Sequence, residues 1–261
     1  MAETTDDSEF MPQAPVNHGA ARIVPLGDSA AIVILGDSIS PQIHNRVRAL
    51  CRYLEHHPFT GMTELVPSFT SIAVYYDGLG VLKAYQEYIR LGEECYPFLV
   101  VAALLEKILS LVESELPLQP RTVRIPVYYG GEAGPDLEFV ARQNDLSPQE
   151  VIGIHSSAEY LVYMLGFAPG FPYLGGLPSS ISTPRRLSPR VAIPAGSVGI
   201  AGDQAGVYPL ETPGGWQLIG RTPISLFKPE AVPPTLLQAG DIVRFYPITR
   251  REFIEWGEDT P

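Results

Sequence analysis

The chain has 261 residues, of which 45% are hydrophobic, so it is long and apolar enough for one large or two medium-sized domains with packed cores. Its formal net charge of −11 argues against general binding of nucleic acid or of an anionic membrane, because either surface would repel the chain. The two cysteines, Cys51 and Cys95, lack the spacing of a metal site or of a disulfide framework, so neither is predicted.

The N-terminal stretch is acidic and polar. It has no basic segment followed by an apolar one, so it is not a secretory signal, and we expect residues 1–20 to be a disordered tail. The most apolar run, residues 97–105, is far shorter than the roughly 20 residues that a membrane span needs. These features predict a cytoplasmic protein.

Residues 21–118 are expected to form a small α/β domain. Two short β-like runs flank Gly27-Asp28, which is typical of a hairpin. Ser40 and Pro41 then favour the start of an amphipathic helix, because a serine N-cap followed by proline is a helix-start signal. The further predicted elements are strands at residues 64–67 and 71–77, a helical region in two pieces at 79–116 and a linker at 117–120.

Residues 119–250 are expected to form a second domain. It is predicted to begin with a strand at residues 123–129, a helix at 136–142 and a helix from the capping box of Ser147 and Glu150 to His155.

Short strand candidates with turn residues between them follow this helix at close spacing. They are residues 160–165, 191–193, 197–201, 206–208, 216–219, 224–227 and 241–245. This density predicts a closed or nearly closed β-barrel, so the chain is expected to be an α+β protein. Residues 251–261 are left as a C-terminal tail.

The stretch at residues 166–176 combines glycines and prolines with three aromatic rings. It therefore predicts neither a helix interior nor a central strand. It is too apolar for an ordinary solvated loop, so we expect it to lie against another surface. A glycine-rich stretch follows at residues 196–206, but its spacing favours barrel turns and bulges over a phosphate-binding loop.

Four arginines near these stretches run against the acidic balance of the chain: Arg185, Arg186, Arg190 and Arg221. Because a guanidinium makes bidentate contacts with carboxylates and phosphates, they predict either an anionic ligand or pairing with Asp203, Glu211 or an acidic partner surface. His155, at a predicted helix end, is either a general base or a helix-capping residue. Aromatic residues in the same region form either core or the lining of a pocket or a protein-binding groove: Phe167, Phe171, Tyr173, Tyr208 and Trp216.

The sequence around these loops resembles the B subunit of bacterial 5-oxoprolinase, a family also called KipI and often labelled allophanate hydrolase subunit 1. The similarity rests on the long motifs at residues 163–177, 184–190, 194–202 and 213–223, and it extends over nearly the whole chain. It implies a cyclophilin-like fold for the barrel. The segment at residues 85–97 is longer than in the family, which would alter a partner surface there.

The resemblance also implies work within a complex. With a homologous C subunit and a separate A subunit, the B subunit acts in an ATP-dependent amidohydrolase that opens 5-oxo-L-proline to L-glutamate, and it is expected to be inactive alone. ATP is the cofactor of the complex, and no metal or biotin attachment is expected in this chain. Related proteins imply two alternatives, a histidine-kinase-binding inhibitor and a carboxyltransferase component of a urea carboxylase or allophanate-type system.

The candidate site residues form two groups. The catalytic candidates are His155, Arg186, Arg190 and Arg221. The candidates for substrate binding or for a subunit interface are Gly170, Phe171, Pro172, Tyr173, Gln204, Tyr208, Gly214, Gly215 and Trp216.

Overall fold

The computed structural model describes residues 16–18, 21–86, 96–112 and 120–258, and the chain divides into two compact units, Met1–Leu118 and Gln119–Pro261. Parts of the expected tail, of the long segment at residues 85–97 and of the linker lie outside the described residues. No helix in these described ranges is long and apolar enough to cross a membrane.

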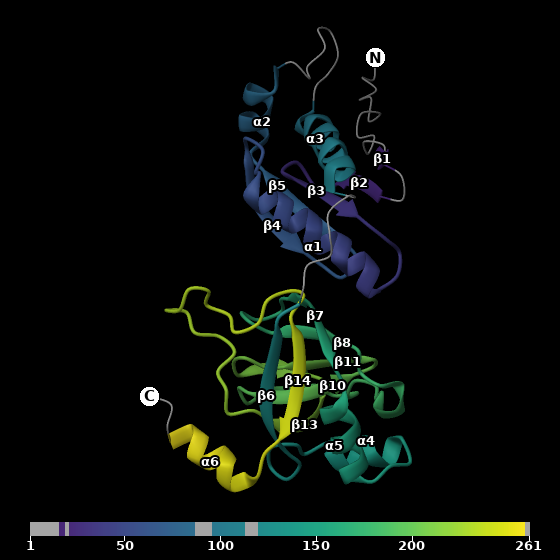
Figure 1. Ribbon diagram of the computed structural model, residues 1–261, viewed down its shortest axis with the longest axis vertical. Helices are drawn as coiled ribbons and strands as arrows, with labels where there is room; N and C mark the ends of the chain where they lie inside the picture. The colour runs from purple at the N-terminus through teal and green to yellow at the C-terminus, as the bar shows by residue number, and fades with distance from the viewer. Residues whose placement is uncertain (1–15, 19–20, 87–95, 113–119, 259–261) are drawn as a thin grey trace, which may run out of the picture. The chain divides into compact units, whose positions relative to one another are not determined.

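The first unit is built on an antiparallel sheet with the strand order β1-β2-β3-β5-β4. Helices α1 and α3 pack together against this sheet (Figure 1). The elements of this unit are β1 (Val16–His18), β2 (Ala21–Pro25), β3 (Ala30–Ile34), α1 (Pro41–His56), β4 (Met62–Pro67), β5 (Ser71–Tyr76), α2 (Gly78–Ala84) and α3 (Pro97–Val112).

Local signals in the sequence explain how these elements begin. The predicted hairpin is confirmed, since β2 pairs with β3 across the Gly27 turn, where the backbone has a φ of 63°. Ser40 caps α1 by accepting a hydrogen bond from the Ile43 backbone N–H at 3.2 Å. The buried face of α1, which includes Leu50 and Leu54, meets the buried side chains of the sheet in one apolar core.

The second unit contains a closed barrel with the strand order β10-β11-β8-β7-β14-β6-β13, which confirms the barrel prediction (Figure 1). Helices α4 and α5 pack on each other and on the barrel strands β13 and β14. The elements are β6 (Thr122–Tyr129), α4 (Leu137–Gln143), α5 (Pro148–Ser157), β7 (Tyr160–Leu165), β8 (Pro172–Gly175), η2 (Ser179–Ile181), β9 (Arg190–Ile193), β10 (Ser197–Ala201), β11 (Gln204–Val207), β12 (Thr212–Gly214), β13 (Gln217–Arg221), β14 (Ile242–Pro247) and α6 (Arg250–Glu258).

The barrel closes through its last strand. β14 lies between β6 and β7, parallel to β6 from Ile242 opposite Thr122 to Pro247 opposite Val127, and antiparallel to β7. The last strand of the unit therefore holds its first strand in place.

The aromatic stretch at residues 166–176 differs from its prediction, because its second half is the barrel strand β8. This strand pairs with β7 on one side and with β11 on the other. Pro172 is tolerated because it is the first residue of the strand, where a missing N–H donor costs least. The exclusion of a central strand here was therefore wrong.

Three other predictions also differ from the structure. Residues 224–227 form no strand, and only an isolated bridge joins Phe227 to Thr235. β9 lies outside the barrel, in a two-stranded ribbon with β12. The expected C-terminal tail carries α6, whose first turn is capped by the hydroxyl of Thr249, which accepts from the Glu252 backbone N–H.

The glycine-rich stretch contributes strands of the barrel wall. The ladder between β10 and β13 has an irregularity between Val198 and Gly199, as expected for a bulge. A Cβ on Gly206 would lie 2.8 Å from the ring of Phe171 and 2.9 Å from that of Trp216. The bare backbone of Gly206 therefore gives two aromatic rings a surface on which to pack, which supports the barrel interpretation over a phosphate loop.

Candidate functional site

Asp136 anchors a polar network on the barrel wall. Its backbone N–H donates to the Leu218 carbonyl at 2.9 Å, and its Oδ2 accepts from the Leu218 N–H at 2.7 Å. Asp136 occupies the N-cap position of α4, yet its carboxylate makes no capping hydrogen bond. The carboxylate is instead turned toward strand β13 and the residues beside it.

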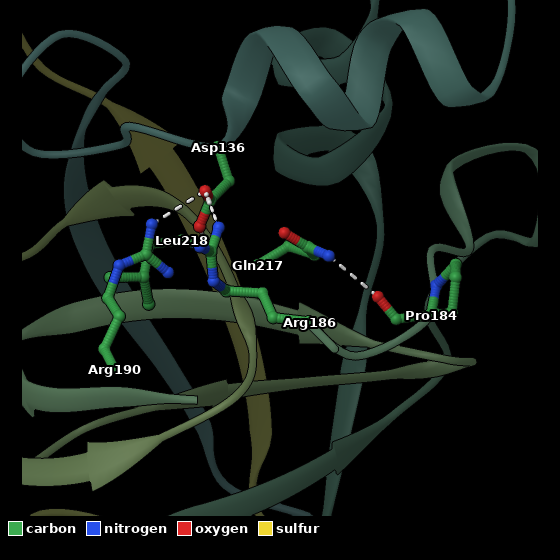
Figure 2. A network of polar contacts seen from close by, with 6 residues as sticks. All are labelled: Asp136, Pro184, Arg186, Arg190, Gln217 and Leu218. Atoms are coloured by element: carbon green, nitrogen blue, oxygen red, sulfur yellow. Dashed lines mark hydrogen bonds and ion pairs between the residues drawn. The ribbon is translucent and has the colours of Figure 1, made fainter. Parts of the chain in front are cut away.

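Two of the predicted arginines meet on this carboxylate. Arg186 Nη1 and Arg190 Nη2 both donate to Asp136 Oδ1, at 2.9 and 2.7 Å (Figure 2). The backbone N–H of Arg186 donates to the Gly215 carbonyl at 2.8 Å, and Arg190 begins β9 opposite Gly214. The predicted glycines thus lie beside the predicted arginines.

The carboxylate of the network is buried, and its two guanidinium groups are partly buried. The exposed fraction is 6% for the Asp136 side chain, 36% for that of Arg186 and 23% for that of Arg190. Two guanidinium groups share one carboxylate, so the network keeps a net positive charge. Its electrostatic interactions are stronger here than they would be on a fully hydrated surface.

Several buried polar atoms in this region have no hydrogen-bond partner among the described residues. They include Nε of Arg186, Nη1 of Arg190 and Oε1 of Gln217. The other end of the Gln217 amide donates to the Pro184 carbonyl at 2.9 Å (Figure 2). Unpaired buried polar groups are costly and rare, and their concentration in one place is typical of a functional site.

An aromatic cluster lies next to this network. The Phe171 ring packs edge-to-face against Tyr208, at 5.2 Å between centroids, and against Trp216 at 5.4 Å. Tyr173 contacts the rings of Phe171 and Trp216. Burial raises the pKa of Tyr208 to about 12. The guanidinium carbon of Arg185 lies 5.9 Å from the centroid of the Trp216 ring, so a cation–π contact links the cluster to the arginines.

The exposed ring of Phe167 extends this cluster to the surface. Its exposed fraction is 63%, and its centroid is 5.5 Å from that of Phe171. Phe167 also has a φ of 68°, a left-handed conformation that is unfavourable for a bulky residue. Strained backbone of this kind is concentrated at ligand clamps and active sites.

Other candidates lie apart from the Asp136 network. Arg221, in β13, donates from Nε to the Ala195 carbonyl at 2.7 Å. Gln204 begins β11 opposite Ala201. A Cβ on Gly170 would meet Phe227 at 3.2 Å, which places Gly170 beside the segment after β13.

His155 lies buried where helix α5 packs on the barrel strands. Its side chain is fully buried, its Nδ1 is 2.8 Å from Tyr129 Oη, and its ring stacks on Phe245 with centroids 4.7 Å apart. Burial lowers the pKa of His155 to about 3, so the ring is neutral at physiological pH. The helix also continues to Ser157, and the geometry gives His155 no access to a substrate.

The network contains residues that the sequence did not single out as functional. If they bound no ligand, the arginines were expected to pair with Asp203, Glu211 or an acidic partner surface, but two of them pair with Asp136. An aspartate at a helix start is readily explained as a cap, so only the three-dimensional structure shows that its carboxylate bonds to the arginines instead. Gln217 gave no signal, because one amide in a strand is unremarkable.

The chain matches known proteins over most of its length. The family model described as "Carboxyltransferase domain, subdomain C and D" matches residues 21–237. A Bacillus subtilis protein named as the B subunit of 5-oxoprolinase is 51% identical over 92% of this chain and 98% of its own length. An Escherichia coli protein with the same name is 42% identical over 87% of this chain and 96% of its own length.

The fold is also similar to that of a solved enzyme. The crystal structure of Kluyveromyces lactis urea carboxylase matches with a TM-score of 0.70 and 23% identity, over 99% of this chain and 25% of that one. The chain therefore belongs to the carboxyltransferase subdomain C and D family, together with the relatives named as 5-oxoprolinase B subunits.

Proposed function

We propose that this chain is the B subunit of an ATP-dependent 5-oxoprolinase complex, which opens 5-oxo-L-proline to L-glutamate. The observation that carries the proposal is the 51% identity to a protein of that name over 98% of its length. The relative is named as one subunit of an enzyme, which supports a multi-subunit complex. We propose that the chain works with the A and C subunits of such a complex and is inactive alone.

The arginine network offers positive charge, which this reaction can use at two points. 5-Oxoproline carries a carboxylate, and negative charge develops on the lactam oxygen while the C–N bond is opened and water is added. Arg186 and Arg190 place positive charge in a half-buried site, which favours binding of an anion and stabilises developing charge. The neighbouring cluster around Phe171 and Trp216 excludes water from one side.

The proposal assigns ATP to the complex and assigns no residue of this chain to it. It places the complex in the cytoplasm, where ATP is supplied. Because His155 is buried, the proposal also gives it no proton transfer. A base would come from another group of the assembled complex.

The direct test is reconstitution. The chain is purified with the A and C subunits, and ATP-dependent release of glutamate from 5-oxoproline is measured with and without it. We expect activity only from the complete set. The proposal is wrong if the complete set is inactive, or if leaving out this chain has no effect on the rate.

Two matched arginine variants extend this test. The double substitution Arg186→Ala and Arg190→Ala should abolish most of the activity. Arg244→Ala removes an exposed guanidinium that pairs with Glu159 on the barrel surface, so this control should leave the rate unchanged. Equal rates for the double variant and the wild type would show that Arg186 and Arg190 are not part of the site.

A carboxyltransferase component is the second candidate, favoured by the description of the matching family model. Carboxyl transfer from biotin and opening of a lactam differ in their response to avidin, which sequesters biotin. Activity of a carboxyltransferase system is lost when avidin is added, whereas that of the proposed 5-oxoprolinase is retained.

A further inference from the structure

The carboxylate of Asp136 accepts hydrogen bonds from residues far along the chain and none from the first turn of its own helix. An aspartate at an N-cap position ordinarily accepts a hydrogen bond from the first turn, which stabilises the helix. In this protein the cap bond is missing from α4. The hydrogen bonds of the carboxylate go to Arg186, Arg190 and the Leu218 N–H, which are 50, 54 and 82 residues further along the chain.

The geometry of this arrangement fixes two guanidinium groups relative to each other. Both donate to the same oxygen atom, Asp136 Oδ1, so neither can rotate away without losing a charge-assisted hydrogen bond (Figure 2). The Leu218 N–H holds the other oxygen and so sets the orientation of the carboxylate. Without the carboxylate, two like charges in a half-buried site would repel each other.

We propose that Asp136 is a positioning residue, which aligns Arg186 and Arg190 so that both guanidinium groups face one anionic group of the substrate. This inference rests on the proposed function for the identity of the substrate. Asp136 acts only through the arginines and does not itself contact the substrate. Its effect on binding should therefore disappear when the arginines are absent.

The chain offers a matched control in Asp241. This residue is also an aspartate of the barrel unit, 4% exposed, and it accepts from Arg121 Nε at 3.1 Å and from the Gln238 backbone N–H at 2.8 Å. It thus combines a buried carboxylate, an arginine and a backbone donor, as Asp136 does. Arg121 and Asp241 have no place in the proposed site, so Asp241→Asn reports the structural cost alone.

The kinetic test compares Asp136→Asn with Asp241→Asn in the reconstituted complex. Because misaligned guanidinium groups would lose about one charge-assisted hydrogen bond to the anion, we expect Asp136→Asn to raise KM for 5-oxoproline by about 10- to 100-fold. Asp241→Asn should lower the Tm by about as much as Asp136→Asn does, but it should leave KM unchanged. Equal KM values for the two variants would overturn the proposal.

A double-mutant cycle separates positioning from a direct role. When Arg186 and Arg190 are both alanine, adding Asp136→Asn should change the residual kcat/KM less than about twofold, because interacting residues are not additive. A further loss as large as that seen in the wild-type background would overturn the proposal. Asp136→Glu, which keeps the charge but moves it by one methylene, replaces Asp136→Asn if the latter does not fold.

Mobility of the arginine side chains provides a readout that does not depend on the reaction. In ¹⁵N relaxation measurements on the chain, Asp136→Asn should increase the mobility of the Arg186 and Arg190 Nε–H groups, and Asp241→Asn should not. Unchanged mobility in Asp136→Asn would overturn the positioning role. An inactive wild-type complex with ordered arginines would instead overturn the proposed function and leave the positioning role intact.

Discussion

The Nδ1 atom of His155 lies 2.8 Å from the hydroxyl oxygen of Tyr129, in the buried layer between helix α5 and the barrel strands. The hydroxyl of Tyr160 donates to the backbone carbonyl of His155 at 2.9 Å, and Phe245 stacks on the imidazole ring. This histidine therefore acts as part of the packed core. Its burial also makes the stability of the protein dependent on pH.

The free energy of unfolding should fall in acid because of His155. Burial lowers its pKa from 6.5 in the unfolded chain to about 3 in the folded protein. The stabilisation is therefore complete above pH 6.5 and is lost as the pH falls toward 3, with a slope of up to about 1.4 kcal/mol per pH unit. Urea unfolding from pH 7 to pH 4 should show a smaller slope for His155→Phe than for the wild type.

Exposed His56 supplies the control for this pH dependence. It lies in the last turn of α1, where its Nδ1 contacts only the Arg52 carbonyl of the same helix. His56→Gln should keep the slope of the wild type. If His155→Phe keeps that slope as well, the pH dependence has another origin.

Gly214 should not tolerate even a methyl group. A Cβ at this position would lie 2.4 Å from the buried hydroxyl of Tyr208 and 2.8 Å from Ile193. Gly214→Ala should therefore destabilise the protein by about 1–3 kcal/mol, the usual cost of overpacking. It should also displace Tyr208 in the aromatic cluster, which a change in the near-ultraviolet circular dichroism would report.

The matched change Gly153→Ala should have the opposite effect. Nothing lies within 4 Å of a Cβ at Gly153, which is an exposed position in the helix α5. Alanine favours a helix interior over glycine by about 1 kcal/mol, so the midpoint of urea unfolding should rise. Equal midpoints for the two alanine variants would contradict at least one of the two predictions.

Asp145→Gly should stabilise the barrel unit. Asp145 follows α4 with a φ of 54°, and the Leu146 N–H bonds to the Ala141 carbonyl at 2.9 Å, as in a Schellman motif. Glycine adopts this left-handed conformation at lower cost than aspartate, so we expect a gain of about 1 kcal/mol. Thermal unfolding measures it, and Asp145→Ala, which retains the strain, should show no such gain.

Removing both site arginines should harm the fold through Asp136. In Arg186→Ala/Arg190→Ala the buried carboxylate keeps only the Leu218 N–H as a partner. An uncompensated buried charge costs about 3 kcal/mol, so the double variant should unfold at lower urea concentration than the wild type. Adding Asp136→Ala should recover part of this loss. A triple variant less stable than the double variant would contradict the explanation.

Local chemistry made parts of the fold predictable from the sequence. The hairpin at Gly27, the Ser40 cap and the capping box of Ser147 and Glu150 each depend on residues within a few positions of one another, and each is confirmed. The barrel was predictable from the density of short strands. β8 was not, because Pro172 and the glycines around it carry the composition of a loop and only pairing with β7 and β11 makes this segment a strand.

The candidate site was predictable only in part. Arg186, Arg190, Tyr208 and Trp216 stood out by residue type and by resemblance, and the structure brings them close to one another. Asp136 did not, because its partners lie 50 or more residues away and its position at a helix start gave no reason to look further. The roles of these residues in catalysis, and a histidine kinase as partner, stay predictions.

The position of β14 between β6 and β7 determines when the barrel can form during synthesis. β6 emerges from the ribosome long before both of its neighbours, so it is unpaired until β13 is made from Gln217 on and lacks its second neighbour until Ile242. A chain that stops before Ile242 would leave the facing edges of β6 and β7 open to pairing with other chains. Premature termination shortly before Ile242 should therefore give aggregation rather than a smaller soluble protein.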